Sequence, residues 1–285
     1  MVGRGADAAL TRRGADAAWT LVVHADSPRR VSSVRMAPVF SPLWFGVGAA
    51  VGAVAGPVVR AAIFRYAVPY DEPWRTNCPT CDTPLVRGNW RLLRSALPPS
   101  GRCRNCRQRI GPPIGVVELV GAAVVGVLAA VVGPHPVTLA FAWAALIGVA
   151  LGFVDVAVHR LPDPLIITGL VGTVPLLAIA VIAGAPPKHL LTAAIGGLAT
   201  GAIFFVMAFL PRGMGLGDAK LAVLTGLCAG WFGGWAALYA WVFGIVLAGP
   251  AALLLIITRR ARRRDSLPIG PFMLLGALAA ILLFA

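Results

Sequence analysis

Two aspartates lie where acidic residues are rare in this 285-residue sequence. After Glu118 the sequence has four acidic residues, Asp155, Asp163, Asp218 and Asp265, within runs of Ala, Leu, Val, Ile and Gly. Ionisable groups at membrane depth are costly, so such acids are candidates for function. Two carboxylates about 3 Å apart cannot both ionise readily and therefore share a proton. If Asp155 and Asp218 meet, one can act as a base on water while the other protonates a carbonyl oxygen.

Four further residues are candidates for supporting roles around this pair. Gly215 and Gly217 immediately precede Asp218 in a Gly-x-Gly-Asp turn, and Lys220 follows it. Because glycine has no Cβ, both positions let the backbone closely approach another helix or an extended substrate. Asp163 lies between two prolines in a segment that is typical of a turn starting the next apolar run.

The same residues also have a purely structural interpretation. Asp155 and Asp163 could cap helices or pair with Arg160, and Asp218 could pair with Lys220. His159 lies one turn from Asp155 if the helix continues, but it could equally be an interfacial residue. The sequence alone leaves these alternatives open.

Four of the five cysteines form two Cys-x-x-Cys pairs, Cys78 with Cys81 and Cys103 with Cys106, separated by 21 residues. This spacing is typical of a tetrahedral zinc site, and four thiolates leave no open coordination position, so the predicted role is structural. Two disulfides or redox-active dithiols are the alternative. The fifth cysteine, Cys228, lies in an apolar run, is interpreted as a small hydrophobic residue and is given no role.

Composition indicates a membrane protein. Hydrophobic residues make up 58% of the chain and charged residues 13%, against roughly 25% charged in ordinary globular domains. The mean hydropathy is +0.82. The net charge of +14 does not indicate nucleic-acid binding, because the basic residues lie between apolar runs and act as topology signals. No nucleic-acid partner is predicted.

Apolar runs of the length that a bilayer requires divide the chain. They are near residues 40–62, 114–132, 137–154, 165–184, 190–210, 219–233, 235–257 and 267–285. The predicted fold is an all-α polytopic membrane protein with about eight transmembrane helices and a cytoplasmic loop carrying the four cysteines between the first two. The predicted divisions are a disordered or mis-started tail (1–38), the first transmembrane helix (39–64), the cysteine loop (65–113) and a second membrane domain (114–285).

The distribution of basic residues predicts the topology. Of the 19 Lys and Arg residues after residue 35, all except Lys188 fall on one side if the loop 65–113 is cytoplasmic. Asp155 and Asp218 then lie at the same cytoplasmic edge. That side is reducing, which favours zinc over disulfides. The tail carries six arginines on the opposite side, so we expect that translation starts at Met36 and that residues 1–35 are absent from the mature protein.

At this point the sequence resembles the type IV prepilin peptidase family over about residues 40–285. The two Cys-x-x-Cys pairs are followed by a segment ending in Glu118-Leu119, and Asp155 precedes Leu161-Pro162-Asp163 at the family's spacing. Gly215-Leu216-Gly217-Asp218-Ala219-Lys220-Leu221 matches the family's Gly-x-Gly-Asp-x-Lys-Leu, and Leu267-Pro268-Ile269-Gly270-Pro271-Phe272 matches its Pro-x-Gly-Pro-Phe.

The resemblance implies an aspartic endopeptidase of the bacterial plasma membrane, in contact with membrane lipids, with Asp155 and Asp218 as the catalytic pair. Its implied substrates are prepilins or pseudopilins, cut after a glycine that ends a short basic leader. Many family members also methylate the new N-terminus with S-adenosylmethionine, and they require the cysteine loop for this. Here the first span lacks the family's Gly-Ser-Phe-x-Asn and contains Gly52-Ala53-Val54-Ala55-Gly56 instead, which bears on methylation more than on proteolysis.

Two other classes of function are alternatives to the peptidase. A transporter could use the aspartates as a proton relay, although such sites usually lie near the middle of the bilayer within broken helices. A zinc-stabilised scaffold in pilus assembly would need neither aspartate.

Overall fold

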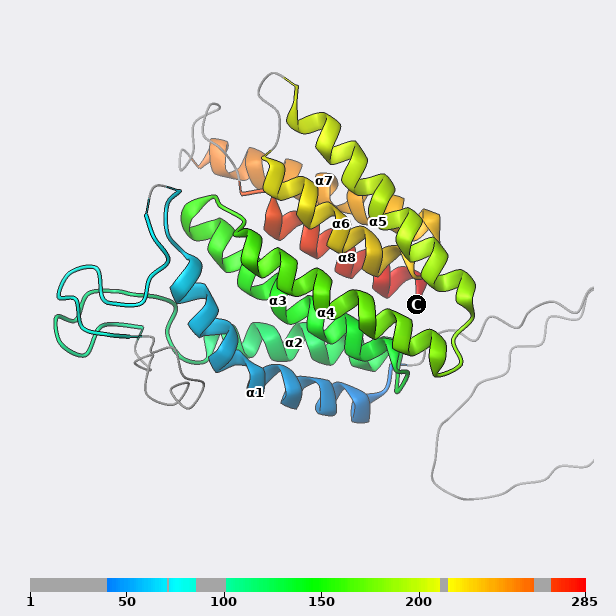
Figure 1. Cartoon of the computed structure of the whole chain (residues 1–285), viewed down its shortest axis with the longest axis horizontal. Helices are drawn as coiled ribbons and strands as arrows, with labels where there is room; N and C mark the ends of the chain where they lie inside the picture. The colour runs from blue at the N-terminus through cyan, green and yellow to red at the C-terminus, as the bar shows by residue number, and fades with distance from the viewer. Residues whose placement is uncertain (1–39, 71, 86–100, 211–214, 259–267) are drawn as a thin grey trace, which may run out of the picture. The chain divides into compact units, whose positions relative to one another are not determined.

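The computed structural model describes residues 40–285 except 71, 86–100, 211–214 and 259–267. The described residues form eight helices and no β-strand (Figure 1). The helices are α1 (Pro42–Tyr66), α2 (Val116–Val132), α3 (Val137–Val158), α4 (Asp163–Ile182), α5 (Pro187–Ala208), α6 (Leu216–Gly230), α7 (Gly234–Ile257) and α8 (Gly270–Phe284). The predicted tail, 1–38, and the expected absence of residues 1–35 fall outside the described residues.

The predicted all-α polytopic membrane fold is confirmed. Each apolar run coincides with one helix, with ends that differ by a few residues. Five helices, α1, α3, α4, α5 and α7, are long and apolar enough to cross a membrane. Helices α2, α6 and α8 have 17, 15 and 15 residues. The number of helices that span the bilayer therefore stays a prediction.

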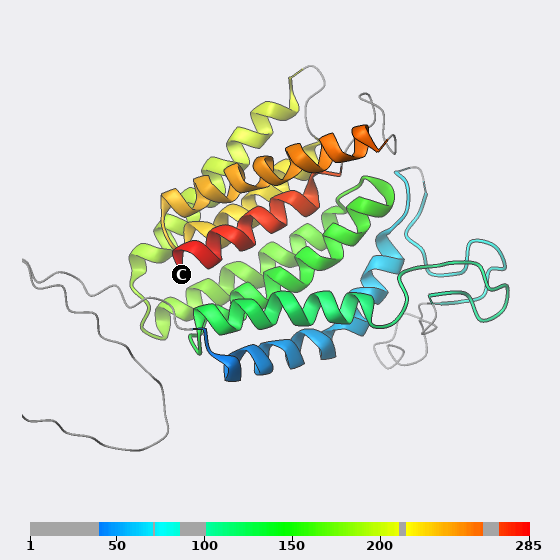
Figure 2. The same cartoon turned by 180° about the vertical axis from the view of Figure 1, so that it is seen from behind.

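Consecutive helices pack in pairs, α1 with α2, α3 with α4, α5 with α6 and α7 with α8. Two helices are central to the packing (Figures 1 and 2): α3 contacts α1, α2, α4, α6 and α8, and α6 contacts α3, α4, α5, α7 and α8. Asp155 is on α3 and Asp218 is on α6. The two candidate acids thus belong to the two helices that most other helices surround.

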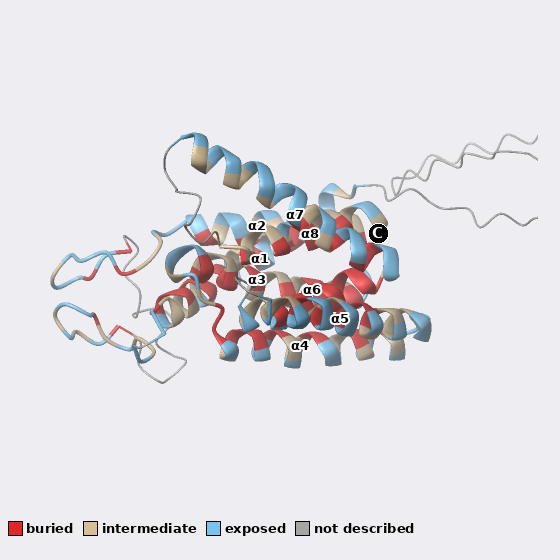
Figure 3. Ribbon diagram, turned by 90° about the horizontal axis from the view of Figure 1, so that it is seen from above, coloured by how far each residue is buried: buried red, intermediate tan, exposed pale blue. Residues whose placement is uncertain are grey.

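Burial separates an inner from an outer side on most helices. In Figure 3 the buried residues gather where helices face one another, and exposed residues lie on the outward faces. Those outward faces carry large apolar side chains, including Val54, Ile182 and Leu198. Exposed aliphatic side chains along apolar helices are typical of surfaces that contact lipid tails.

A stripe of glycines brings α1 against α2. Gly48, Gly52 and Gly56 recur every fourth residue, lie on one face of α1 and are all buried. A Cβ on Gly52 would overlap the carbonyl group of Gly121 and lie 2.7 Å from the backbone nitrogen of Ala122. The two backbones therefore touch directly, which is the arrangement that small residues permit between membrane helices.

We predict that Gly52→Leu destabilises the protein by about 3 kcal/mol, because the side chain would have to displace the α2 backbone. The matched control is Gly46→Leu on the exposed face of α1, where a Cβ meets no atom within 4 Å. The thermal unfolding midpoint in detergent should fall for the first variant and stay within error for the second. Equal midpoints would contradict the close α1–α2 contact.

Candidate active site and cysteine cluster

Asp155 lies in the last turn of α3 and is held by the start of α8. Its side chain is buried, with the residue 5% exposed, and Oδ2 accepts a hydrogen bond from the backbone N–H of Gly270 at 2.9 Å. The first N–H groups of a helix have no partner within it, so this donor is available. A Cβ on Gly270 would lie 2.8 Å from Oδ2. Only glycine fits at this position without moving the carboxylate.

Asp218 lies in the first turn of α6. Its Oδ2 accepts a hydrogen bond from the backbone N–H of Gly215 at 3.0 Å, which is a capping interaction. The predicted Gly-x-Gly-Asp turn is wrong for most of its length, because helix begins at Leu216 and includes Gly217 and Asp218. The carboxylate of Asp218 lies within electrostatic range of Asp155. The fold thus brings within electrostatic range two acids that are 63 residues apart in sequence.

The other predicted supporting residues join α6 to the turn between α3 and α4. Lys220 Nζ lies 2.7 Å from Asp163 Oδ1, so Lys220 pairs with Asp163 rather than with Asp218. Both side chains are about half exposed, so the pair contributes little to stability by itself. A Cβ on Gly217 would lie 2.9 Å from Cβ of Leu161, whereas one on Gly215 would make only ordinary contact with Asp218. Close approach therefore requires glycine at 217, while Gly215 contributes its N–H.

Arg160 pairs with neither candidate acid. Its Nη1 donates hydrogen bonds to the carbonyl oxygens of Pro69 at 2.7 Å and Val68 at 3.4 Å. Its guanidinium also lies 4.4 Å from the ring centroids of both Tyr70 and Trp74. Such cation–π contacts are favourable where the cation is partly desolvated. We call this set of contacts the Arg160 clasp; it ties the α3–α4 turn to the segment that leads into the cysteine loop.

His159 ends α3 in the left-handed conformation, with φ of 51°, and its backbone N–H bonds to the carbonyl oxygen of Asp155. The structure therefore gives His159 a role in helix termination.

Sequence reasoning missed three features of this end of the bundle. One feature of the sequence could have indicated the bond from Gly270 to Asp155, namely a Pro-x-Gly-Pro segment just before the last apolar run. No such feature indicated the Arg160 clasp, because its partners are about 90 residues away. The third is a largely buried ion pair between Arg60 of α1 and Glu118 of α2, with Arg60 Nε 3.5 Å from Glu118 Oε1.

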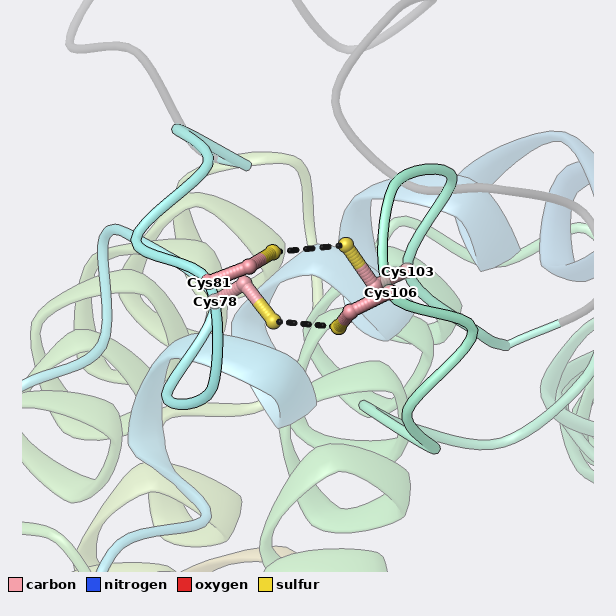
Figure 4. A group of neighbouring side chains, drawn as sticks. All are labelled: Cys78, Cys81, Cys103 and Cys106. Carbon is pink, nitrogen blue, oxygen red and sulfur yellow. Dashed lines mark hydrogen bonds between the residues drawn. The ribbon is translucent and has the colours of Figure 1, made fainter.

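The four cysteines of the two Cys-x-x-Cys pairs converge on one point (Figure 4). Their sulfur atoms all lie within 4.8 Å of one another, with 3.5 Å between Cys78 and Cys106 and 3.6 Å between Cys81 and Cys103. Sulfurs on a tetrahedral zinc ion are about 3.8 Å apart, given Zn–S bonds of about 2.3 Å. The cluster therefore fits the predicted zinc site, and none of these cysteines forms a disulfide.

Each Cys-x-x-Cys pair lies in a backbone turn of the same kind. The N–H groups of Asp82 and Arg107, each four residues after the first cysteine of its pair, bond to that cysteine's carbonyl oxygen. Both residues have positive φ, 53° and 60°. Two copies of one turn face each other across the sulfurs, and Phe64 of α1 is buried in the same small apolar cluster. The cysteine loop is thus packed onto the end of α1.

The thiols cannot ionise independently. Hydrogen bonds from the side chain and backbone of Thr83 lower the pKa of Cys81 to about 6. The backbone of Gln108 lowers the pKa of Cys106, but burial and the neighbouring cysteines outweigh it and raise that pKa to about 12. Ionisation of one thiol in the cluster therefore disfavours ionisation of its neighbours. A divalent cation removes this conflict, because it binds all four sulfurs as thiolates.

These features define an integral membrane protein of helices that carries, at one end, a four-cysteine cluster and two neighbouring carboxylates. The chain belongs to the type IV leader peptidase family, whose model matches residues 145–285. The matched part contains both aspartates and Gly270 but none of the four clustered cysteines.

Curated relatives match more of the chain. It is 31% identical over 217 residues to the prepilin leader peptidase/N-methyltransferase of Burkholderia pseudomallei, covering 73% of this chain and 66% of that protein, just under two thirds of its length. The protein of the same description from Aeromonas salmonicida is 30% identical, with 73% and 71% covered. That from Pseudomonas aeruginosa is 29% identical, with 79% and 76% covered. No solved structure matches significantly.

Proposed function

We propose that this protein is a membrane aspartic endopeptidase that removes the short basic leader of type IV prepilins or pseudopilins at the cytoplasmic face. The observation that carries the proposal is that Asp155 and Asp218, from the two central helices, lie within electrostatic range of each other at one end of the bundle. Family membership and the names of the curated relatives support the same activity.

The two carboxyls would divide the chemistry of peptide hydrolysis between them. Asp218 is at the N-terminus of α6, where the helix dipole favours negative charge, so it suits the base that takes a proton from water. The water oxygen then bonds to the scissile carbonyl carbon, while Asp155 donates its proton to the carbonyl oxygen. The tetrahedral intermediate collapses when the C–N bond breaks: the leaving nitrogen takes a proton from Asp218, and one hydroxyl of the intermediate returns its proton to Asp155 as the carboxylic acid forms. The bond from Gly270 keeps Asp155 oriented throughout.

The distribution of charge supports a cytoplasmic location for the two acids. The end that holds both acids also holds the cysteine loop with nine arginines, and cytoplasmic loops carry an excess of Lys and Arg. A substrate with a basic leader would present its cut site on that side. Lipids would cover the apolar outward faces of the helices.

The cysteine cluster would hold structural zinc through Cys78, Cys81, Cys103 and Cys106. Four thiolates complete the coordination of zinc, so the ion would stabilise the loop and would not bind substrate. N-methylation of the new N-terminus is the second activity in the relatives' names. In that reaction S-adenosylmethionine would supply the methyl group, and no residue of this chain is assigned to it.

A proton-relay transporter is less well supported. Both acids are in the terminal turns of their helices, with Asp155 three residues before the end of α3 and Asp218 in the first turn of α6. Relay sites in transporters are usually at mid-membrane, between broken helices.

The proposal predicts that the purified protein, reconstituted in liposomes, cleaves a prepilin with a basic leader. Mass spectrometry of the product should show loss of the leader, and an added methylene when S-adenosylmethionine is present and the second activity is retained. A folded protein that leaves the prepilin intact would contradict the peptidase assignment. Proton flux into the same liposomes without cleavage would favour the transporter.

A further inference from the structure

An apolar groove of about 330 Å³ lies among α2, α3, α6 and α8. Its longest wall is α3, which contributes residues at helical spacing from Phe141 through Ala145 and Gly152 to Val156. Among the described residues that line it, the only polar side chains are those of Thr225 and Cys228 on α6, and Thr225 already donates its hydroxyl to the α6 backbone. The groove thus offers almost no hydrogen bonds and suits an apolar occupant.

One end of the groove is at the candidate catalytic pair. Val156 directly follows Asp155, and Pro271 directly follows Gly270, whose N–H donates to Asp155. From Val156 to Phe141 the wall runs for 15 residues of helix, or about 22 Å at a rise of 1.5 Å per residue. The groove therefore runs from the end of α3 that carries Asp155 deep into the part of the protein that the membrane surrounds.

The groove is open along its side. Three residues of its rim are partly exposed, Val156 by 59%, Leu275 by 49% and Val120 by 37%. Its floor on α3 is built from small residues, Ala144, Ala145, Gly148 and Gly152. Small residues let another helix approach closely within a membrane. An occupant can therefore enter sideways from the lipid.

The volume defines how an occupant would bind. A helix of about 22 Å in length and 10 Å in diameter fills about 1,700 Å³, roughly five times the groove. The groove can thus take the side chains along one face of such a helix, while its other face stays in lipid. Only a helix satisfies its own backbone polar groups in such an apolar setting.

We propose that this groove binds the transmembrane helix of the substrate that adjoins the scissile bond. The inference rests on the proposed function, and it adds the surface that selects the substrate. A helix seated in the groove would have its membrane-edge end beside Asp155 and Asp218, which brings the adjoining peptide bond to the carboxylates.

The first test fills the groove with Gly152→Leu. A Cβ at residue 152 would make only ordinary contact, 3.5 Å from Leu274, so the larger side chain should extend into the free space. KM for a full-length prepilin should rise about tenfold, equivalent to roughly 1.4 kcal/mol, with little change in kcat. Gly46→Leu, the same substitution on the open face of α1, should leave KM unchanged.

The second test locates the helix through Cys228, which lines the groove. Cys228 is ten residues beyond Asp218 on α6, about 15 Å along the helix. In an Asp218→Asn background, a cysteine about ten residues from the scissile bond of the prepilin should form a disulfide with Cys228 when a thiol oxidant is added. Other prepilin positions that form this disulfide should recur every three to four residues, as on one face of a helix. Cys228→Ala should abolish the cross-linked product.

The outcomes separate this inference from the proposed function. Unchanged KM in Gly152→Leu together with no disulfide to Cys228 at any position would overturn the groove assignment, and would leave the groove to lipid alone. In that case the unsubstituted protein would still cleave the prepilin. Failure of the unsubstituted protein to cleave would instead contradict the peptidase activity itself, and a helical pattern of disulfides would still support the groove.

Discussion

Asp155→Asn and Asp218→Asn should each lower the rate of prepilin cleavage by roughly 1,000-fold or more. Each substitution removes a proton donor or acceptor but keeps nearly the same shape. The asparagine amide oxygen can still accept the hydrogen bond from Gly270 or Gly215, so the helix ends should stay in place. Single-turnover cleavage of a purified prepilin, followed by gel mobility and mass spectrometry, measures the effect directly.

The matched control is Asp82→Asn, the same change at an exposed acid of the cysteine loop. Asp82 has φ of 53°, a conformation that asparagine adopts readily, and its Oδ1 accepts a bond from Asn77 that an amide oxygen can also accept. This variant should cleave at the unsubstituted rate. Near-normal cleavage by either Asp155→Asn or Asp218→Asn, with the protein present in the membrane, would refute the assignment of the pair.

Cys78→Ser and Cys103→Ser should each release the metal from the purified protein and open the cysteine loop. Four thiolates hold one zinc ion, so the metal content should fall from about one per chain to near zero. Zinc binding stabilises small zinc sites by about 10–16 kcal/mol, far more than the small apolar cluster around Phe64 can replace. Elemental analysis gives the metal content, and limited proteolysis gives the opening of the loop.

The fifth cysteine supplies the control for this experiment. Cys228 is buried in α6, outside the cluster, so Cys228→Ser should retain a full complement of zinc. Lower pH should release zinc from the unsubstituted protein, because protons compete with the metal for the thiolates. A protein that contains no zinc when purified under reducing conditions, with an intact loop, would contradict the metal assignment.

The helices could be predicted from the sequence because long apolar runs have few alternatives in a membrane. Their ends were less predictable, since they depend on partners elsewhere in the chain. The run predicted to begin at residue 219 starts instead at Leu216, where the carboxylate of Asp218 receives the N–H of Gly215. That capping bond converts an expected turn into the first turn of a helix.

The partners of the charged residues were harder to predict than the residues themselves. Asp218 and Lys220 are two residues apart on a helix and so point to different sides, which leaves Lys220 free to reach Asp163. The pairing of Lys220 with Asp163 could be inferred only once Asp218 and Lys220 were known to lie in the same helix. The Gly270 donor and the Arg160 clasp join segments separated by about 90 residues or more, and neither leaves a periodic signal.

The hydrogen bond between Gly270 and Asp155 also links completion of the site to the docking of the last helix. Synthesis proceeds from the N-terminus, so α3 and α6 are made before α8. Until α8 docks, the buried carboxyl of Asp155 lacks its backbone partner, and burying a polar group without one is unfavourable. Docking of α8 is therefore stabilised by the hydrogen bond that it supplies to Asp155. In a nascent chain that has not yet inserted α8, Asp155 lacks the hydrogen bond that orients it.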